Sequence, residues 1–279
     1  MHPSHVWIDE ETLKGLYVDQ RLTAIVIAAR IGCGPTTVFR RLRDFGIAIR
    51  PRGLSSRSEV KWQSPSAFWS SEKAYAVGLI ATDGNLSTDG RHMSVTSKDL
   101  DLLEALRRCL QLQTPISKTR NSTGKVYHRV QWGDRGLYDW LLAIGLTPAK
   151  SLTLGALTVP KEYFVDFFRG CIDGDGSVLV YTDRYHMVKN ERYQYERLYV
   201  NLVSASRPFL DWIQEEVRCL AGVNGVIEAK REPGRRTIWL LRYAKRESIR
   251  LLRWMYYAPD LPCLSRKREK AEQFLSRGF

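Results

Sequence analysis

The same short motif occurs twice in this chain, at residues 76–84 and again at residues 168–176. Each copy has apolar residues at helical spacing around a glycine and ends in Asp-Gly before a stretch with strand character. Aligning the copies sets Gly78 opposite Gly170 and Asp83 opposite Asp175. A glycine on the apolar side of a helix lets a second backbone approach closely. The repeat therefore predicts that the two helices pack together and bring their C-terminal aspartates side by side.

The acids of the motif stand where a helix disfavours them. In the second copy, Asp173 and Asp175 fall at the C-terminal end of the expected helix, where the helix dipole is negative. Two acids in this position, at a helix-to-strand corner, predict a bound cation. A single copy is explained equally well by a core helix that ends in an ordinary Asp-Gly turn, but two copies in register are not.

Both stretches resemble the LAGLIDADG motif of homing endonucleases, and the segment from Arg169 to Gly176 is a close match. The first copy departs from the motif at Ala81, where the family often has an acid. Both copies keep the later acid, which the family uses for metal. The resemblance covers about residues 70–279 and implies a pseudo-symmetric nuclease with both halves in one chain.

The charge balance favours a polyanionic partner. The chain carries a net charge of +13, whereas its hydrophobic content of 44% is ordinary for a globular protein. A solvated basic surface is the alternative, but an excess spread along the whole chain favours nucleic acid. The five cysteines lack zinc-site spacing. Because no apolar run reaches the length of a membrane span and the N-terminus has no signal-peptide pattern, we expect a cytoplasmic, nucleoid-associated protein.

Residues 1–48 predict a small all-α domain with three short helices, the third of which begins at Pro35. Val38, Phe39 and Leu42 are expected to face partly inward. The arrangement resembles the helix-turn-helix of DNA-binding regulators and recombinases, in which the start of the third helix contacts base edges. The candidate DNA contacts on this helix are Thr36, Thr37, Arg40, Arg41 and Arg43. The alternative is a three-helix bundle that binds nothing.

Residues 49–69 predict a linker, because serine, proline and arginine are frequent there and no apolar period is present. Arg52 is a candidate DNA contact, since a basic segment beside a helix-turn-helix often lies along phosphates. A solvated tether is the alternative.

The two repeats, expected at residues 70–159 and 160–279, each follow the order helix, two strands, helix, two strands, helix. The expected fold class is therefore α+β, with two pseudo-symmetric αββαββα repeats whose antiparallel sheets face DNA, plus the small all-α helix-turn-helix domain. The first hairpin of the second repeat carries a long tip, from Asp183 to Tyr195.

Basic and polar side chains on the expected strands suit a two-stranded ribbon in a major groove. In the first repeat the candidate contacts are Lys118, Arg120, Lys125, Arg129 and Gln131, with His128 expected on the same outward face. In the second repeat they are Arg184, Arg197, Lys230, Arg231, Arg235, Arg236 and Arg242. An antiparallel sheet with one wet face would explain the polar alternation but not the surplus of one charge sign.

The resemblance also implies the chemistry. Hydrolysis of a phosphodiester needs an activated water and stabilised charge on the attacking and leaving oxygens, and carboxylate-bound divalent cations supply both. Asp83 and Asp175 are the candidate catalytic and metal-binding residues for Mg²⁺ (or Mn²⁺), with the carbonyl oxygens of Thr82 and Gly174 as further ligands.

Two lysines, Lys150 and Lys267, match the lysines that the family places near the scissile phosphates. For Lys267, which lies in the charge run 266–270, a solvated helix face is the alternative. Asp173 has no acidic counterpart at Ala81, so a capping or supporting role is expected for it.

These features predict a monomeric endonuclease that binds a long, asymmetric double-stranded DNA site and makes a staggered double-strand break. No membrane and no obligatory protein partner is expected. One alternative is a transcription regulator that kept the fold and lost cleavage, against which the retained aspartates and lysines argue. The other is an RNA maturase that uses the same surface, which nothing in the sequence excludes.

Overall fold

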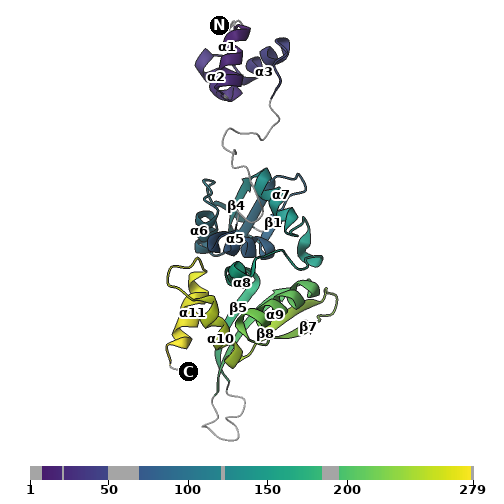
Figure 1. Ribbon diagram of the computed structural model, residues 1–279, viewed down its shortest axis with the longest axis vertical. Coiled ribbons are helices and arrows are strands. Elements are labelled where there is room, and N and C mark those ends of the chain that lie inside the picture. Colours follow the sequence, from purple (N-terminus) through teal and green to yellow (C-terminus); the bar gives the residue numbers. More distant parts are fainter. Residues whose placement is uncertain (1–7, 21, 50–68, 121–122, 184–194, 278–279) are drawn as a thin grey trace. The chain divides into compact units, whose positions relative to one another are not determined.

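The structure is a computed structural model of the 279-residue chain and describes residues 8–20, 22–49, 69–120, 123–183 and 195–277 (Figure 1). The chain divides into two compact units, Met1–Lys61 and Trp62–Phe279, and both expected repeats lie in the second. The finer division expected at residues 48, 69 and 159 remains a prediction. In the described parts of the chain, no helix is long and apolar enough to cross a bilayer.

The described part of the first unit is helical. Its elements are α1 (Glu10–Lys14), the single π-helical turn η1 (Gly15–Asp19), α2 (Ala24–Ile31) and α3 (Pro35–Asp44). The side chain of Asp9 caps α1 by accepting from the backbone N–H of Thr12 at 2.7 Å. Gly32, with φ of 75°, ends α2 in the left-handed conformation that favours glycine. The sequence predicts three short helices in this unit, and the two caps mark the start of the first and the end of the second.

The core of the first unit is a small apolar cluster that includes Leu13, Tyr17, Ile27, Val38 and Leu42. Phe39, for which the sequence predicts a partly inward position, is exposed instead. Val38 and Leu42 lie four residues apart and form the buried stripe of α3, and Phe39 falls beside that stripe.

The second unit contains the two repeats in the expected order. The elements of the first repeat are α5 (Ser71–Thr82), β1 (Gly84–Leu86), β2 (His92–Ser97), α6 (Leu100–Cys109), β3 (Ser117–Arg120), β4 (Val126–Gly133), α7 (Arg135–Ala143) and the 3₁₀ turn η2 (Lys150–Leu152). Those of the second are the 3₁₀ turn η3 (Lys161–Tyr163), α8 (Phe164–Asp175), β5 (Gly176–Asp183), β6 (Tyr195–Ser204), α9 (Arg207–Ala221), β7 (Val226–Lys230), β8 (Ile238–Tyr243), α10 (Lys245–Met255) and α11 (Ser265–Leu275).

Each repeat forms one four-stranded antiparallel sheet. The strand orders are β1-β2-β4-β3 and β5-β6-β8-β7, so the two sheets have the same topology. Together with the helices they form the α+β fold of two αββαββα repeats, which confirms the predicted fold class. Figure 1 shows the two sheets in separate halves of this unit, with α5 and α8 where the halves meet.

The two motif helices form the centre of the second unit. Every residue of α5 from Ala74 to Ala81 is buried, and so is every residue of α8 from Asp166 to Asp173. A helix that is buried on all sides belongs to the core of a larger unit. One continuous apolar core runs from the first repeat through this helix pair into the second. The fold therefore holds the C-terminal ends of α5 and α8 in fixed relation to each other.

Candidate active site

The motif glycines allow α5 and α8 to touch backbone to backbone. A Cβ atom built on Gly78 would lie 3.0 Å from Gly170 Cα and would overlap the carbonyl oxygen of Phe167. A Cβ atom built on Gly170 would lie 3.1 Å from Gly78 Cα and would overlap the carbonyl oxygen of Tyr75. The close helix packing predicted from the two glycines is confirmed.

This packing brings the ends of the two helices together. Asp83 directly follows α5, and Asp175 is the last residue of α8. A Cβ atom built on Gly174 would lie 3.4 Å from Asp83 Oδ2, so the carboxylate of the first motif lies beside the backbone of the second. Burial raises the pKa of Asp83 to about 6, and the negative charge of Asp175 contributes to that rise. Burial also raises the pKa of Asp175.

The two candidate lysines occupy matching places. The ammonium of Lys150 donates a hydrogen bond to the carbonyl oxygen of Gly84, and that of Lys267 donates to the carbonyl oxygen of Gly176 at 2.7 Å. Gly84 and Gly176 are equivalent positions, because each follows the final aspartate of its motif. The match between the lysines, made from the sequence, thus corresponds to one repeated contact in the structure.

Lys267 is not part of a solvated helix face. Only 4% of the residue is exposed, and its ammonium also donates to the carbonyl oxygens of Ile172 (2.6 Å) and Asp173 (2.8 Å). It thereby places a positive charge at the C-terminal end of α8, where the helix dipole favours one. Burial lowers the pKa values of Lys150 and Lys267 to about 8, while nearby aspartates oppose that shift.

The donor set fits a divalent cation of the magnesium type. Among the described residues, no group of three or more histidine, cysteine, aspartate or glutamate side chains could hold a metal ion, so Asp83 and Asp175 stand as a pair. Mg²⁺ accepts few protein carboxylates because it keeps waters and takes phosphate oxygens of a substrate. Burial disfavours the charged forms of these two carboxyls in the metal-free site, and a bound divalent cation would favour them. Thr82 and Gly174 flank the pair, and their roles as carbonyl ligands remain predictions.

The raised pKa of Asp83 leads to a prediction on stability. A carboxyl whose pKa is higher in the folded than in the unfolded chain contributes stability that is present below about pH 4 and is lost as the pH rises through about 6. Asp83→Asn is therefore expected to raise the melting temperature of the metal-free protein near neutral pH, with a gain that disappears toward about pH 4. Thermal unfolding with a chelator at several pH values measures this. A gain of equal size at every pH would contradict the assignment.

Asp173 connects structural elements around the site through hydrogen bonds. Its Oδ2 atom accepts hydrogen bonds from the Tyr75 hydroxyl (3.0 Å) and from the backbone N–H of Leu264 (2.7 Å), the residue before α11. It thus joins the first motif helix to the start of the helix that carries Lys267. The supporting role expected for Asp173 agrees with these contacts.

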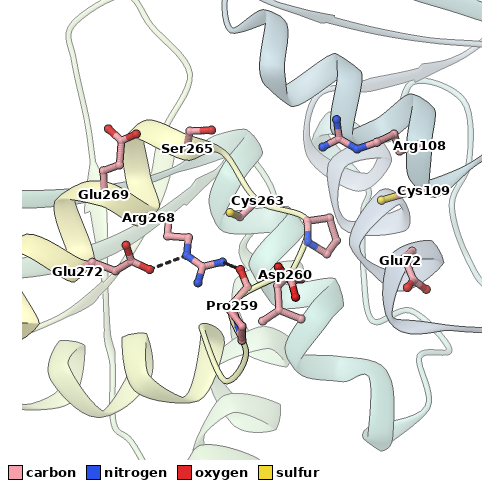
Figure 2. A pocket seen from close by; sticks show the side chains of 12 residues that line it. Glu72, Arg108, Cys109, Pro259, Asp260, Cys263, Ser265, Arg268, Glu269 and Glu272 are labelled. Atoms are coloured by element: carbon pink, nitrogen blue, oxygen red, sulfur yellow. Dashed lines mark hydrogen bonds and ion pairs between the residues drawn. The ribbon is translucent and has the colours of Figure 1, made fainter.

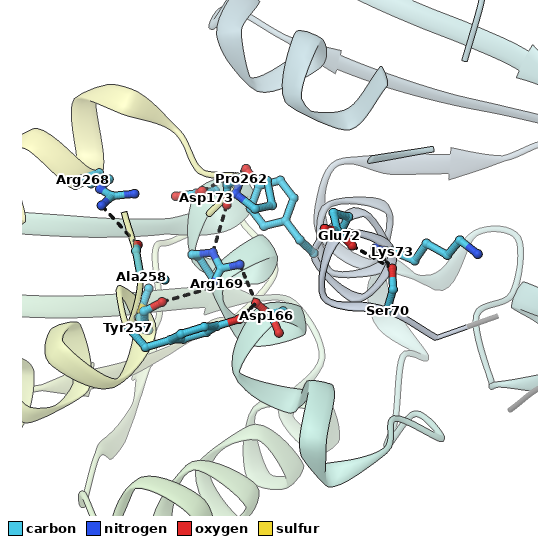
Figure 3. A network of polar contacts seen from close by, with 12 residues as sticks. Ser70, Glu72, Lys73, Asp166, Arg169, Asp173, Tyr257, Ala258, Pro262 and Arg268 are labelled. Atoms are coloured by element: carbon cyan, nitrogen blue, oxygen red, sulfur yellow. Dashed lines mark hydrogen bonds and ion pairs between the residues drawn. The ribbon is translucent and has the colours of Figure 1, made fainter. Parts of the chain in front are cut away.

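A buried ion pair beside Asp173 was not predicted from the sequence. Arg169 donates to Asp166 at 2.6 Å and to the backbone carbonyls of Met255 (3.0 Å) and Pro262 (2.9 Å), as Figure 3 shows in part. These bonds fix the segment between α10 and α11 against α8. The sequence contains a pattern that could have predicted this pair: an acid and an arginine stand three residues apart on an otherwise apolar helix.

The structure has a pocket of about 510 Å³, whose lining side chains are drawn in Figure 2. Its lining includes Glu72, Arg108, Cys263 and Arg268. Glu72 is in the first turn of α5, whereas Asp83 follows its last turn, so the pocket is at the other end of that helix. The aspartate pair does not line this pocket.

The strand register corrects one expectation for the first sheet. Lys118 pairs with His128, and Arg120 pairs with Val126. These four residues point to the same face of the sheet as the core residue Val130, because residues two apart in a strand share a face. The opposite face carries Arg129 and Gln131. The prediction that all of these side chains point outward from one face is therefore wrong, because adjacent residues of a strand point to opposite sides of the sheet. Lys125 is exposed in the turn before β4.

The second sheet places its candidate contacts together. Arg197, Lys230 and Arg242 lie on the face opposite the core residues Val200 and Leu241. Arg197 pairs with Asp183 at 3.0 Å, and Arg242 pairs with Glu228 at 3.3 Å. The other candidates of this hairpin, all exposed near its turn, are Arg231, Arg235 and Arg236.

The remaining candidate contacts are on α3 or outside the described residues. Thr36, Arg40 and Arg43 are exposed on α3, whereas Thr37 and Arg41 are half-buried. Arg41 lies 3.6 Å from the carboxylate of Asp44. The candidates outside the described residues are Arg52 and Arg184, together with most of the hairpin tip expected from Asp183 to Tyr195.

The chain was compared with protein-family models, curated proteins and solved structures, and the family-model match includes the first motif. Residues 71–145 match the family model of the LAGLIDADG-like domain. A search of curated proteins found no match. Among solved structures, full-length DUF199/WhiA from Thermatoga maritima aligns with 16% identity over 75% of this chain, at a TM-score of 0.47. The chain spans 62% of the length of that protein.

Two homing endonucleases align over most of their own length. The homing endonuclease I-DmoI, in complex with DNA and Ca, aligns with 17% identity over 73% of this chain and 97% of that one, at a TM-score of 0.46. The homing endonuclease I-WcaI, bound to its DNA recognition sequence, aligns with 11% identity over 79% of this chain and 95% of that one, at a TM-score of 0.45. The family-model match at residues 71–145 contains the first motif, and the helix of that motif packs against the helix of the second.

Proposed function

We propose that this protein is a metal-dependent endonuclease that cuts double-stranded DNA at a specific site. The observation that carries the proposal is the pairing of Asp83 with Asp175 at the ends of two helices packed through glycine, with one buried lysine at the matching place in each half. Carboxylates that hold a cation, together with positive charge for a phosphate, suit the metal-dependent hydrolysis of a phosphodiester.

Asp83 and Asp175 would hold Mg²⁺ or Mn²⁺ between the helix ends. Such a cation, when bound, lowers the pKa of a coordinated water and neutralises charge on the attacking and leaving oxygens. Lys150 and Lys267, with pKa values of about 8, are mostly protonated at neutral pH and stabilise negative charge near the phosphates. Because the two halves repeat each other, each aspartate and its lysine serve one DNA strand, and the product is a staggered double-strand break.

The basic surface supports DNA as the substrate. With a net charge of +13, the protein attracts a polyanion, and the open faces of the two sheets suit the major groove. Both halves of the site come from one chain, so a monomer is sufficient for cleavage of both strands.

A DNA-binding regulator that does not cleave is the second candidate. The observation that favours it is the bonding of Lys267 to three main-chain carbonyl oxygens, which stabilises the end of α8 whether or not a phosphate is near. The lysine contacts alone therefore do not distinguish the two candidates.

Cleavage of a random library distinguishes them. The purified protein is incubated with randomised duplex DNA and Mg²⁺ or Mn²⁺, and the cut ends are sequenced. A nuclease yields one recurrent sequence around a fixed stagger. Selective binding of a defined duplex without any cut ends in either metal would establish the regulator and overturn the endonuclease.

We further propose that α3 of the first unit adds DNA affinity without taking part in cleavage. Replacing the exposed Arg40 and Arg43 with glutamine is expected to weaken binding and to flatten the salt dependence of log Kd by up to about 0.9 for each phosphate that is no longer neutralised. Cleavage at saturating protein is expected to stay unchanged. Arg30→Gln, an exposed arginine of α2, is the matched control. An equal loss of affinity in that control, or no loss in the double variant, would contradict the role of α3.

A further inference from the structure

The open face of the second sheet, which is the face opposite its core side, carries exposed apolar side chains among its charged ones. Five large hydrophobic or aromatic side chains on it are between 41% and 61% exposed: Leu179, Tyr181, Tyr195, Val226 and Ile238. The register places them on one side, since Leu179 pairs with Tyr199 and Val226 pairs with Arg242, opposite the core residues Val200 and Leu241. Exposed apolar side chains gathered on one face mark a contact surface.

The matching face of the first sheet is polar. Its residues in the described strands are Asn85, His92, Ser94, Thr96, Ser117, Thr119, Tyr127, Arg129 and Gln131. The two halves have the same topology, so this difference comes from the side chains and not from the backbone. The two halves therefore offer different chemistry to whatever covers the two sheets.

The arginines on the open face of the second sheet already have partners. Arg197 contacts Asp183 through both its Nε and Nη2 atoms (3.1 and 3.0 Å), and Arg242 pairs with Glu228 and lies over the ring of Tyr199. An arginine reads guanine with a free pair of N–H groups. These contacts restrain the two guanidinium groups without using all of their five N–H donors, and the exposed apolar residues add a second kind of base contact on this face.

The surroundings of the face favour DNA as its occupant. Lys230, Arg231 and Arg236 are exposed at one end of the β7–β8 hairpin. An apolar strip with a cationic border complements a major groove, where phosphates run along both sides of the base edges. Thymine is the base that presents a methyl group there, and apolar side chains contact it.

We infer that the open face of the second sheet recognises thymine methyl groups in one half of the DNA site, through Leu179, Val226 and Ile238. The inference rests on the proposed function, since it names the sequence chemistry of the DNA that this protein binds. It makes the two half-sites unequal: one is read by polar groups and the other by methyl contacts.

Uracil substitution tests the inference with full-length protein. A duplex is first selected by binding from a random library, and its thymines are then replaced by uracil in one half at a time. This change removes only the 5-methyl groups. Substitution in the half-site under the second sheet is expected to raise Kd by about fourfold for each methyl contacted, from the free energy of burying one such carbon. Substitution in the other half is expected to change Kd by less than about twofold.

Variants identify the face that is responsible. Leu179→Ala and Ile238→Ala are expected to lose the thymine-over-uracil preference of that half-site while keeping most affinity for the uracil duplex. Val126→Ala is the control for truncating an exposed valine away from the open faces, because Val126 lies on the core-side face of the first sheet, and it is expected to keep the preference. Equal sensitivity of both half-sites to uracil, or a preference that survives in both alanine variants, would overturn the inference.

Two further outcomes have separate meanings. If no duplex is selected from the library, DNA binding itself fails and the proposed function fails with it. If the protein instead forms a dimer that Ile238→Ala dissociates in sedimentation, the apolar face binds a second copy, and the thymine inference is overturned while cleavage can persist.

Discussion

Asp83→Asn and Asp175→Asn are each expected to reduce double-strand cleavage by about 10²-fold or more while leaving DNA binding intact. Asparagine keeps the size of the side chain and removes the negative charge that holds a divalent cation. Binding is expected to remain or to improve slightly, because each change removes a carboxylate that faces phosphates. Band-shift titration and cleavage of the same labelled duplex measure the two properties separately.

The two variants are also expected to differ in the strand they affect. Each aspartate belongs to one half of the pseudo-symmetric pair, so nicking of one strand is expected to persist longer than nicking of the other. Asp139→Asn, an exposed acid that pairs with Arg135 on α7, is the matched control and is expected to cut normally. If both site variants cut both strands like the unchanged protein, Asp83 and Asp175 are not the catalytic pair.

The centre of the fold was predictable because the motif occurs twice. Gly78 and Gly170 each lie on an apolar helix. Because glycine has no side chain, the two helices can pack closely where the glycines meet. The position of Asp83 beside the second motif follows from that packing. Lys150 and Lys267 were matched through the lysines that the resembling family places near the scissile phosphates, and their contacts with Gly84 and Gly176 are equivalent.

The faces of the strands were harder to predict. A one-residue error in register moves a side chain to the opposite face, and a short strand with polar residues at consecutive positions gives no alternation to fix that register. Lys118 and Arg129 are an example: the sequence predicts one face for both, whereas the observed register puts them on opposite faces. Along β5 the alternation of buried Val178 with exposed Leu179 was hidden, because both side chains are apolar.

The ion pairs on the open face also depend on neighbours that the sequence does not reveal. Arg197 and Asp183 are held together because β5 and β6 form one hairpin, and Arg242 meets Glu228 across β7 and β8. A surplus of arginine predicts phosphate contacts, but it does not say which guanidinium groups are already occupied. Charge counts therefore supported nucleic acid in general and could not separate the two half-sites.

Gly78→Ala is expected to destabilise the second unit by about 3 kcal/mol or more, and Gly170→Ala by a similar amount. Alanine favours a helix over glycine by about 1 kcal/mol, which would stabilise an isolated α5. At this position the added methyl group would overlap the carbonyl oxygen of Phe167 and lie 2.9 Å from the backbone nitrogen of Cys171. Backbone atoms cannot turn away as a flexible side chain can, so the two helices must separate and the overlap outweighs the helix propensity.

Thermal unfolding measures the balance of these two effects. A loss of about 3 kcal/mol is expected to lower the melting temperature by roughly 6–12 °C in a unit of this size. Gly155→Ala is the matched control, because a Cβ atom there meets nothing within 4 Å. A melting temperature for Gly78→Ala that equals or exceeds that of Gly155→Ala would mean that the helices tolerate a wider spacing, and Asp83 and Asp175 would then not be held together by this contact.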